Sequence, residues 1–392
     1  MSNQRERRLE GKSEILDPFE GLVAGFCEQF ERRNFTGILR RLNRRIIGQE
    51  DFVTALLEQT MLNIRRMRLI ARGADAWTLP RLAPIFVIGS TASGKSFAVE
   101  TFFKELDIEL VTINAASLTG ASYYGNSLDD ELSRIADKLV LPLKPIAILW
   151  DEFDKMVSAN SSDSNPQAEI LKYLEGDSYR GAYQHDPRRN DGTYFTLDTS
   201  LIINVFAGAF SGIEDTVRAR LRSENVALGF ASDPAARATF VLSTAELRER
   251  VTPADLESWG MLSELCGRLG SVLSIPALGE ESLKRIVRDS ENSLQARYGT
   301  LLPGRTKLVI TDAAAGWLAT YALDSKLGAR ALDHEVSALV AHANLQCLRD
   351  HCIDQVIIDQ PRDTDGLALD ICTSKGGLRT QRRIKEVHDR GG

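Results

Sequence analysis

A glycine-rich octapeptide is the feature that most constrains the fold of this 392-residue chain. Residues 89–96 read Gly-Ser-Thr-Ala-Ser-Gly-Lys-Ser, which matches the pattern GxxxxGK[ST]. The apolar run at 84–89 predicts a buried parallel strand before it, and residues 96–106 predict a helix after it. A strand, this loop and a helix together form a phosphate-binding P-loop. The chain is therefore expected to contain an α/β domain that binds a nucleoside triphosphate.

The P-loop pattern gives a role to each position of the octapeptide. Backbone N–H groups would curl around phosphate, and the N-terminus of the following helix would add its positive dipole end. Lys95 would reach the β- and γ-phosphates, and Ser96 would ligate Mg²⁺. The expected nucleotide-binding residues are Gly89, Ser90, Thr91, Ala92, Ser93, Gly94, Lys95 and Ser96. ATP and Mg²⁺ are the expected ligand and metal.

A second apolar run ends in two acidic residues. Residues 146–150 read Ile-Ala-Ile-Leu-Trp and are followed by Asp151 and Glu152. Asp151 would orient Mg²⁺, and Glu152 would polarise the attacking water. A strand that ends in Asp-Glu is often only a solvated strand terminus, but its pairing with Lys95 favours the hydrolytic interpretation. The chain is therefore predicted to be an ATPase.

Composition excludes several other classes of protein. Hydrophobic residues make up 43% and charged residues 26% of the chain, which is typical of folded globular proteins. The net charge of −6 argues against a dedicated nucleic-acid binder, although a local basic stripe stays open. No signal peptide or membrane-spanning run is found. The five cysteines form no CxxC pair, so a reducing compartment, the cytoplasm, is expected.

Strand-like and helix-like runs alternate through most of the chain. Runs at 109–113, 146–150 and 200–206 predict buried strands beside the one at 84–89, which implies a parallel sheet covered by helices. Later runs are amphipathic and predict mainly helices. The expected organisation is a helical N-terminal lead-in at 1–45, a large ATPase domain at 46–276, a small, mostly helical domain at 277–373 and a disordered tail at 374–392.

Several segments resemble the ClpX and HslU protein unfoldases of the AAA+ family, in order and in spacing. Asp-Glu-Phe-Asp-Lys at 151–155 resembles the family's Walker B extension, and Ile-Ile-Gly-Gln at 46–49 is similar to its adenine-pocket box. Further similar segments are the central helix at 171–176, the end of the fourth core strand at 207–210, the arginine-finger segment at 251–269 and the sensor-2 motif at 327–330. The resemblance implies an AAA+ large domain with a parallel sheet, followed by a small helical lid domain.

The resemblance also implies a homohexameric ring whose ATP sites lie between subunits. Arg268 would reach the γ-phosphate held by a neighbouring subunit, and Arg330 would contact the nucleotide of its own subunit. Ile46 and Ile47 would line the adenine pocket. Without this motif context, a surface or interdomain salt bridge would be the better interpretation of either arginine.

Two loops imply contacts with other proteins. The segment at 118–125 aligns with the family's first pore loop, in which Tyr123 takes the aromatic position and Tyr124 the apolar one. Tyrosine side chains can contact a polypeptide of any sequence, because their rings are both flat and amphipathic. Leu228, Gly229 and Phe230 resemble the tripeptide that docks such rings onto a ClpP-type peptidase. The alternatives are ordinary half-buried loop residues for the tyrosines and a stretch folded back on its own domain for the tripeptide.

The sequence also departs from the family. No cysteine-rich zinc domain precedes the ATPase region. The second pore loop of the family corresponds to the short and polar segment at 158–164, and its basic entrance loop is represented only by residues 179–190. No clear sensor-1 residue is found, and Asn204 is named as a candidate for that position. The resemblance implies an unfoldase that threads protein substrates through its pore. A stand-alone remodeller of protein complexes and a nucleic-acid-associated regulator are the alternatives, although the pore tyrosines favour polypeptide over nucleic acid.

Overall fold

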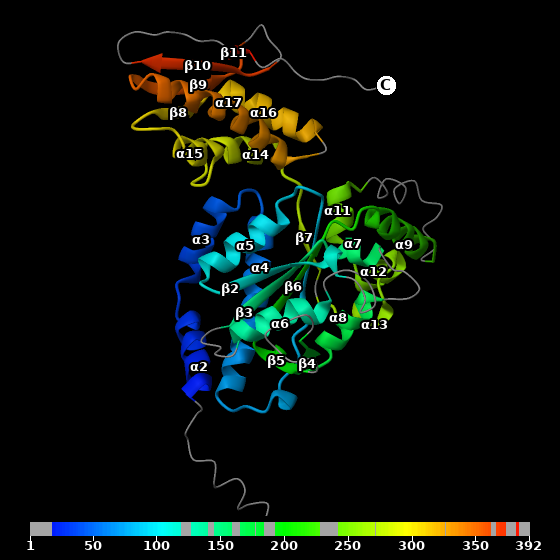
Figure 1. Ribbon diagram of the computed structural model, residues 1–392. Helices are drawn as coiled ribbons and strands as arrows, with labels where there is room; N and C mark the ends of the chain where they lie inside the picture. Colours follow the sequence, from blue (N-terminus) through cyan, green and yellow to red (C-terminus); the bar gives the residue numbers. More distant parts are fainter. Residues whose placement is uncertain are drawn as a thin grey trace, which may run out of the picture. The chain divides into compact units, whose positions relative to one another are not determined.

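The computed structural model divides the chain into two compact units (Figure 1). Unit 1 comprises residues 1–39, 51–89 and 95–275, and unit 2 comprises residues 40–50, 90–94 and 276–392. The structure describes residues 18–118, 127–139, 145–158, 165–176, 178–183, 193–227, 242–270, 272–325, 327–361, 366–373 and 382–383. None of the described helices is both long and apolar enough to cross a membrane.

A five-stranded parallel sheet forms the centre of unit 1. Its strands, in spatial order, are β2 (Glu109–Asn114), β3 (Ile146–Asp151), β6 (Ile202–Gly208), β1 (Ile85–Gly89) and β7 (Val272–Ile275). All five residues of β1 are buried, as expected for a parallel strand that is covered on both faces. The structure confirms the α/β fold class and adds β7, which the sequence pattern did not predict.

Helices and a hairpin surround this sheet (Figure 1). The helices before it in the chain are α2 (Pro18–Glu31), α3 (Phe35–Arg45) and α4 (Glu50–Ala71). Those within the α/β region are α5 (Lys95–Glu105), α6 (Leu128–Leu139), α7 (Phe153–Ser158), α8 (Pro166–Leu174), α9 (Ile213–Ala227), α11 (Thr244–Glu249), α12 (Pro253–Trp259) and α13 (Ser263–Cys266). The antiparallel hairpin pairs β4 (Ser178–Ala182) with β5 (Tyr194–Asp198). Short 3₁₀ turns are η1 (Ala76–Thr78), η2 (Ala115–Ser117) and η3 (Thr199–Leu201).

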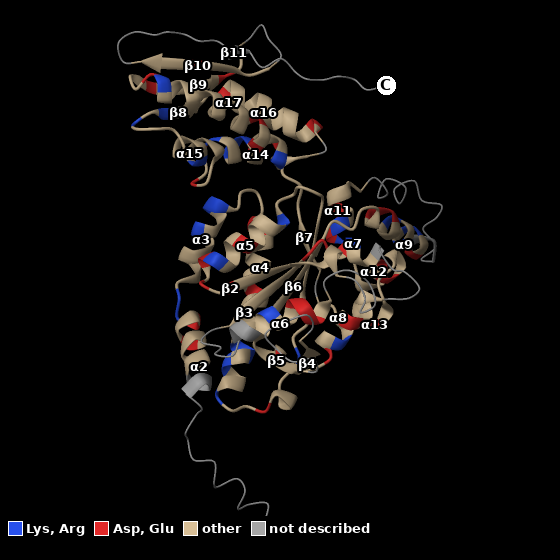
Figure 2. Ribbon diagram, viewed as in Figure 1, with Lys and Arg blue, Asp and Glu red and all other residues tan. Residues whose placement is uncertain are grey.

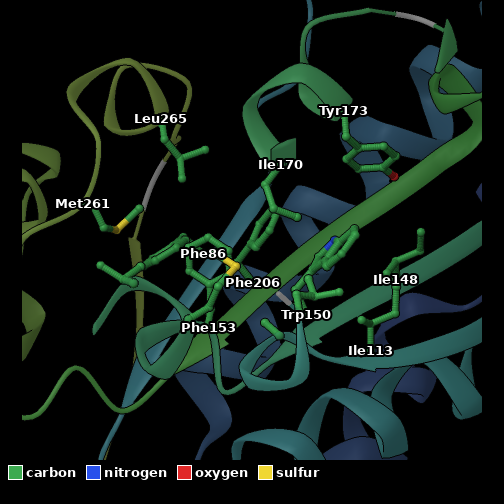
Figure 3. Close-up of a cluster of buried hydrophobic side chains, with 14 of the residues drawn as sticks. Phe86, Ile113, Ile148, Trp150, Phe153, Ile170, Tyr173, Phe206, Met261 and Leu265 are labelled. Carbon is green, nitrogen blue, oxygen red and sulfur yellow. The ribbon is translucent and has the colours of Figure 1, made fainter. Parts of the chain in front are cut away.

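An aromatic cluster fills the core on one face of the sheet (Figure 3). The Trp150 and Phe206 rings stack with their centroids 5.6 Å apart, and Phe153 meets Phe206 edge-on at 4.8 Å. Tyr173, from α8, closes the cluster against Trp150. Such close aromatic pairs add to the stability that burial already provides, so this core fixes β3 and β6 beside each other.

Unit 2 contains a second, smaller sheet in addition to its helices. The helices of its C-terminal part are α14 (Glu280–Val287), α15 (Leu294–Gly299), α16 (Asp312–Asp324) and α17 (Ala329–Arg349). The sheet has the order β11 (Arg382–Arg383), β10 (Ala368–Thr373), β9 (Ile353–Asp359) and β8 (Lys307–Ile310). This region is mostly helical, as predicted, but the sheet was missed. Part of the tail expected to be disordered, residues 382–383, pairs with β10.

Candidate active site

The octapeptide forms a tight loop between β1 and α5, as its pattern predicts. Gly89 ends the strand and Lys95 begins the helix. Gly94 has φ +86°, a left-handed conformation that glycine adopts without strain, and Ala92 has φ +61°. The Lys95 Nζ donates a hydrogen bond to the Gly89 carbonyl at 2.9 Å. This bond folds the lysine side chain back along the loop whose N–H groups would face a phosphate.

The two predicted magnesium ligands lie side by side. The Ser96 hydroxyl donates to Oδ2 of Asp151 at 2.5 Å, while Oδ1 of Asp151 accepts from the backbone N–H of Glu152 at 2.9 Å. A hydroxyl and a carboxylate in contact supply the hard oxygen ligands that Mg²⁺ prefers, with phosphate and water completing its shell. These residues therefore fit the ion.

Glu152 adopts an unusual backbone conformation directly after β3. Its φ is +57°, in the left-handed region that non-glycine residues seldom occupy. Oε1 of Glu152 accepts from Lys155 Nζ at 2.7 Å, and this bond raises the pKa of Lys155. Residues with such strain are found preferentially at functional sites. Glu152 thus lies in this turn, one residue beyond the predicted magnesium ligand Asp151.

The segment at 46–49 contacts the phosphate-binding loop within unit 2. Ile46 and Ile47 are buried, with 2% and 4% of their surfaces exposed. Gln49 Nε2 donates to the Ser93 carbonyl at 2.7 Å, and both residues are almost fully buried. The adenine-pocket box is thus hydrogen-bonded to the P-loop. Gln49 had no predicted role, because nothing in its local sequence pattern indicates a partner 44 residues away.

Arg268 lies at the edge of the central sheet opposite the P-loop. It precedes β7, whose first residue, Val272, pairs with Phe86 near the start of β1, whereas the P-loop follows the end of β1. Arg268 donates to Oε1 of Glu175 at 3.3 Å. Because five strand residues span about 16 Å, Arg268 lies far from Gly89, the residue at the end of β1 where the P-loop begins.

Arg330 is the second residue of α17 and is exposed. It belongs to unit 2, which also contains residues 46–49 and 90–94. Tyr123 and Tyr124 lie outside the described residues, and so do Leu228, Gly229 and Phe230. Their predicted roles stay predictions.

Asn204 does not lie at the edge that carries Asp151. It pairs with Ile148, three residues before Asp151, and its Oδ1 accepts from Trp150 Nε1 at 3.0 Å and from the Tyr173 hydroxyl at 2.9 Å. Its amide is therefore held at the border of the aromatic core. Burial raises the pKa of Tyr173, which keeps this hydroxyl protonated. This position does not support Asn204 as the sensor-1 residue.

The chain matches known families in both of its halves. Residues 85–223 match the family model "ATPase family associated with various cellular activities (AAA)", and residues 278–343 match that of the C-terminal, D2-small domain of ClpB protein. "ATP-dependent Clp protease ATP-binding subunit ClpX" of Azotobacter vinelandii is 30% identical over 322 residues, which cover 78% of this chain and 69% of that protein. The protein of the same name from Bacteroides thetaiotaomicron is 27% identical over 315 residues, which cover 77% and 74%. The one from Porphyromonas gingivalis is 26% identical over 314 residues, which cover 77% and 75%.

Proposed function

We propose that this chain, which belongs to the ClpX family of AAA+ ATPases, uses ATP hydrolysis to unfold protein substrates and thread them through a ring. The chain is an ATPase. The observation that best supports the ring is the placement of the hydrolytic residues and Arg268 at opposite edges of one sheet. A single subunit carries the hydrolytic residues and Arg268 but cannot bring them together, whereas two neighbouring subunits can.

The hydrolytic roles follow from the geometry at the end of β3. The loop at 89–96 would bind the phosphates of ATP, and Ser96 and Asp151 would hold Mg²⁺, which neutralises phosphate charge when bound. Glu152 would accept the proton of the attacking water. In this arrangement Glu152 exchanges its contact with Lys155 for one with water. Arg330 would contact the nucleotide of its own subunit, and Ile46 and Ile47 would line the adenine pocket.

Arg268 would act on the nucleotide of the neighbouring subunit. Its guanidinium is held by Glu175 and is only partly exposed, with 36% of its side chain accessible. An arginine supplied from outside a P-loop stabilises the charge that develops on the transferred phosphoryl group. We therefore propose a homohexamer in which each site is completed by the next subunit.

The domains would be residues 46–276 and 277–373, and the division of the chain after Ile275 supports this boundary. All five cysteines are free thiols, which supports the cytoplasm as its compartment.

The substitution Tyr123→Ala tests the threading mechanism. We expect unfolding of a substrate protein to fall by about tenfold or more, because the change removes a large aromatic contact, whereas ATP turnover should stay within about twofold because no hydrolytic residue is altered. Unfolding is followed by the loss of fluorescence of a fused reporter, and ATP turnover by phosphate release. Trp77→Ala removes an exposed aromatic side chain from η1 and serves as the control. If Tyr123→Ala and the control unfold the substrate at the same rate, Tyr123 does not act as a pore residue.

A deletion of residues 226–232 tests whether a ClpP-type peptidase is the partner. Leu228 and Phe230 would each contribute about 1.5–3 kcal/mol if fully buried in a peptidase cleft, and repeated loops on one ring would add avidity. We expect the deletion to abolish peptidase-dependent degradation and to preserve ATP turnover and unfolding. Deletion of residues 233–239 removes the same length of chain as a control.

The other candidate is a stand-alone remodeller of protein complexes. If the intact protein does not bind a ClpP-type peptidase in the presence of ATP, this candidate replaces the peptidase-linked one. The P-loop, the hydrolytic residues and the ring would be the same in both.

A further inference from the structure

One buried hydrogen bond joins the phosphate-binding loop to the segment before α4. Gln49 Nε2 donates to the Ser93 carbonyl at 2.7 Å. Gln49 and Ser93 have only 4% and 3% of their surfaces exposed, and both belong to unit 2. Because a carbonyl can only accept, this contact fixes which end of the Gln49 amide faces the loop. The side chain is therefore held in one orientation.

The polar atoms around this bond have few other contacts. Gln49 Oε1 and Ser93 Oγ are both buried, and neither has a hydrogen-bond partner among the residues that the structure describes. Folded proteins seldom leave a buried polar atom without a partner. An apolar side chain of similar size would fill the same space without leaving Oε1 unsatisfied. The presence of a glutamine here therefore favours a use for the bond to Ser93 other than stability.

Close packing of the preceding residue determines where Gln49 lies. Gly48 has φ +72°, and a Cβ added to it would lie 2.4 Å from the Ser282 Oγ in α14. Glycine meets both constraints without strain, whereas any larger residue would not. The segment at 46–49 thus packs against α14 and is hydrogen-bonded to the phosphate-binding loop through Gln49.

The contact with Gln49 determines where the next N–H group of the loop points. The Ser93–Gly94 peptide bond is trans, so its carbonyl and its N–H point in opposite directions. Since the carbonyl faces Gln49, the Gly94 N–H points to the other side of the chain. The Ser93 N–H donates to the Ser90 carbonyl at 3.2 Å, whereas none of the described residues accepts from the Gly94 N–H. That N–H is therefore available to a ligand.

We propose that Gln49 is a positioning residue, which holds the Ser93–Gly94 peptide so that the Gly94 N–H faces a phosphate of the bound nucleotide. Backbone N–H groups of a P-loop bind phosphate oxygens, and hydrogen bonds weaken steeply when they are poorly aligned. Without Gln49, the Ser93 carbonyl would lose its partner and the peptide would be free to rotate. This inference rests on the proposed binding of phosphates by the loop at 89–96.

Gln49 acts through orientation and not through charge. Acidic and basic residues are interleaved along the helices of each unit (Figure 2), and the exchange of Gln49 for another neutral residue leaves this distribution unchanged. A change of nucleotide affinity in such a variant therefore does not come from long-range electrostatics. It reports on the loop or on the neighbouring adenine pocket, and these two are separated below.

The substitution Gln49→Met tests the proposal, because methionine has a similar length but no hydrogen-bond donor. We expect the KM for ATP to rise by about tenfold, as for the loss of one well-aligned bond to a charged group, and kcat to stay within about twofold. The Kd of ADP, measured by titration calorimetry, should rise by the same factor. The matched control is Gln295→Met, since Gln295 Oε1 also makes a 2.7 Å bond to the backbone, at the Ile310 N–H of β8. Its KM, kcat and Kd should equal those of the wild type.

Inosine diphosphate separates the loop from the adenine pocket, because it has the phosphates of ADP and a different base. A role at the phosphates predicts that Gln49→Met weakens the binding of ADP and inosine diphosphate by the same factor. Weakening of ADP alone would place the effect at the base and overturn the proposal. If Gln49→Met does not fold, Gln49→Asn replaces it, since its amide is one methylene too short to keep the bond and the same rise in KM is expected.

The Lys95→Ala protein separates this inference from the proposed function. If Lys95→Ala weakens ADP binding and Gln49→Met matches Gln295→Met, the loop binds phosphate and only the role of Gln49 is wrong. If neither Lys95→Ala nor Gln49→Met weakens ADP binding, the proposed phosphate site is wrong as well.

Discussion

Glu152→Gln should lower the rate of ATP hydrolysis by about 10²–10⁴-fold, which is the contribution that a positioned general base makes. The substitution keeps the size of the side chain and removes the carboxylate that would accept a proton from water. ATP binding should persist, because Lys95, Ser96 and Asp151 are unaltered. Phosphate release measures turnover, and retention of a fluorescent ATP analogue measures binding.

Glu249→Gln provides the control for this prediction. Glu249 is an exposed residue at the end of α11, so the same chemical change there should leave turnover at the wild-type rate. If the Glu152→Gln protein hydrolyses ATP at the wild-type rate, Glu152 does not act as the general base. Loss of both turnover and binding would point to damage of the left-handed turn after β3 rather than to lost catalysis.

Lys95→Ala should abolish nucleotide binding in the working range of concentrations. The lysine supplies a charged donor to the phosphates, and loss of about 2 kcal/mol from such a contact weakens affinity by about 30-fold. Because Lys95 Nζ also bonds to the Gly89 carbonyl, the substitution removes a contact that shapes the loop. Titration of the protein with ATP and Mg²⁺ measures the affinity.

The matched control is Lys104→Ala, which removes an exposed lysine from the last turn of the same helix, α5. Its affinity for ATP should equal that of the wild type. If Lys95→Ala binds ATP as tightly as Lys104→Ala, then the loop at 89–96 does not hold the phosphates and the assignment of the site is wrong.

The central strands could be predicted because their signal is local. The runs at 84–89, 109–113, 146–150 and 200–206 are apolar and short, and each became a strand within two residues of the expected bounds. The four-residue β7 lacks such a run, since Ser274 interrupts it. In unit 2, β9 reads Ile-Asp-Gln-Val-Ile-Ile-Asp, and its three buried residues do not alternate strictly. A strand of this kind is specified by its neighbours rather than by its own pattern.

In the hydrolytic site, too, residues in local motifs could be predicted from the sequence, whereas contacts between distant segments could not. Two short motifs contain the predicted hydrolytic residues, which are Lys95, Ser96, Asp151 and Glu152. The motifs follow β1 and β3, two parallel strands of one sheet, and the fold brings Ser96 into contact with Asp151. The contact of Gln49 with Ser93, by contrast, joins segments far apart in sequence. Only the folded chain brings these two residues together, so no spacing rule could have found their contact.

Arg268 has two interpretations, and the structure contains the contact that one of them predicts. Sequence alone left a surface salt bridge as a serious alternative for Arg268, and the structure does contain its ion pair with Glu175. Exposed pairs of this kind contribute little to stability, with typical values of about 0–1 kcal/mol. The observed pair is the contact that this alternative predicts, so the role of Arg268 in a neighbouring site stays a prediction.

The unfolding of a captured substrate tests the central claim most directly. Proteins that remain bound to Glu152→Gln in ATP, but not to Lys95→Ala, identify a substrate, which is then fused to green fluorescent protein. With wild-type protein and ATP, the account predicts loss of the reporter's fluorescence, and no loss with Lys95→Ala. Release of the substrate from its partners while the reporter stays fluorescent would contradict threading and would assign the chain to remodelling without unfolding.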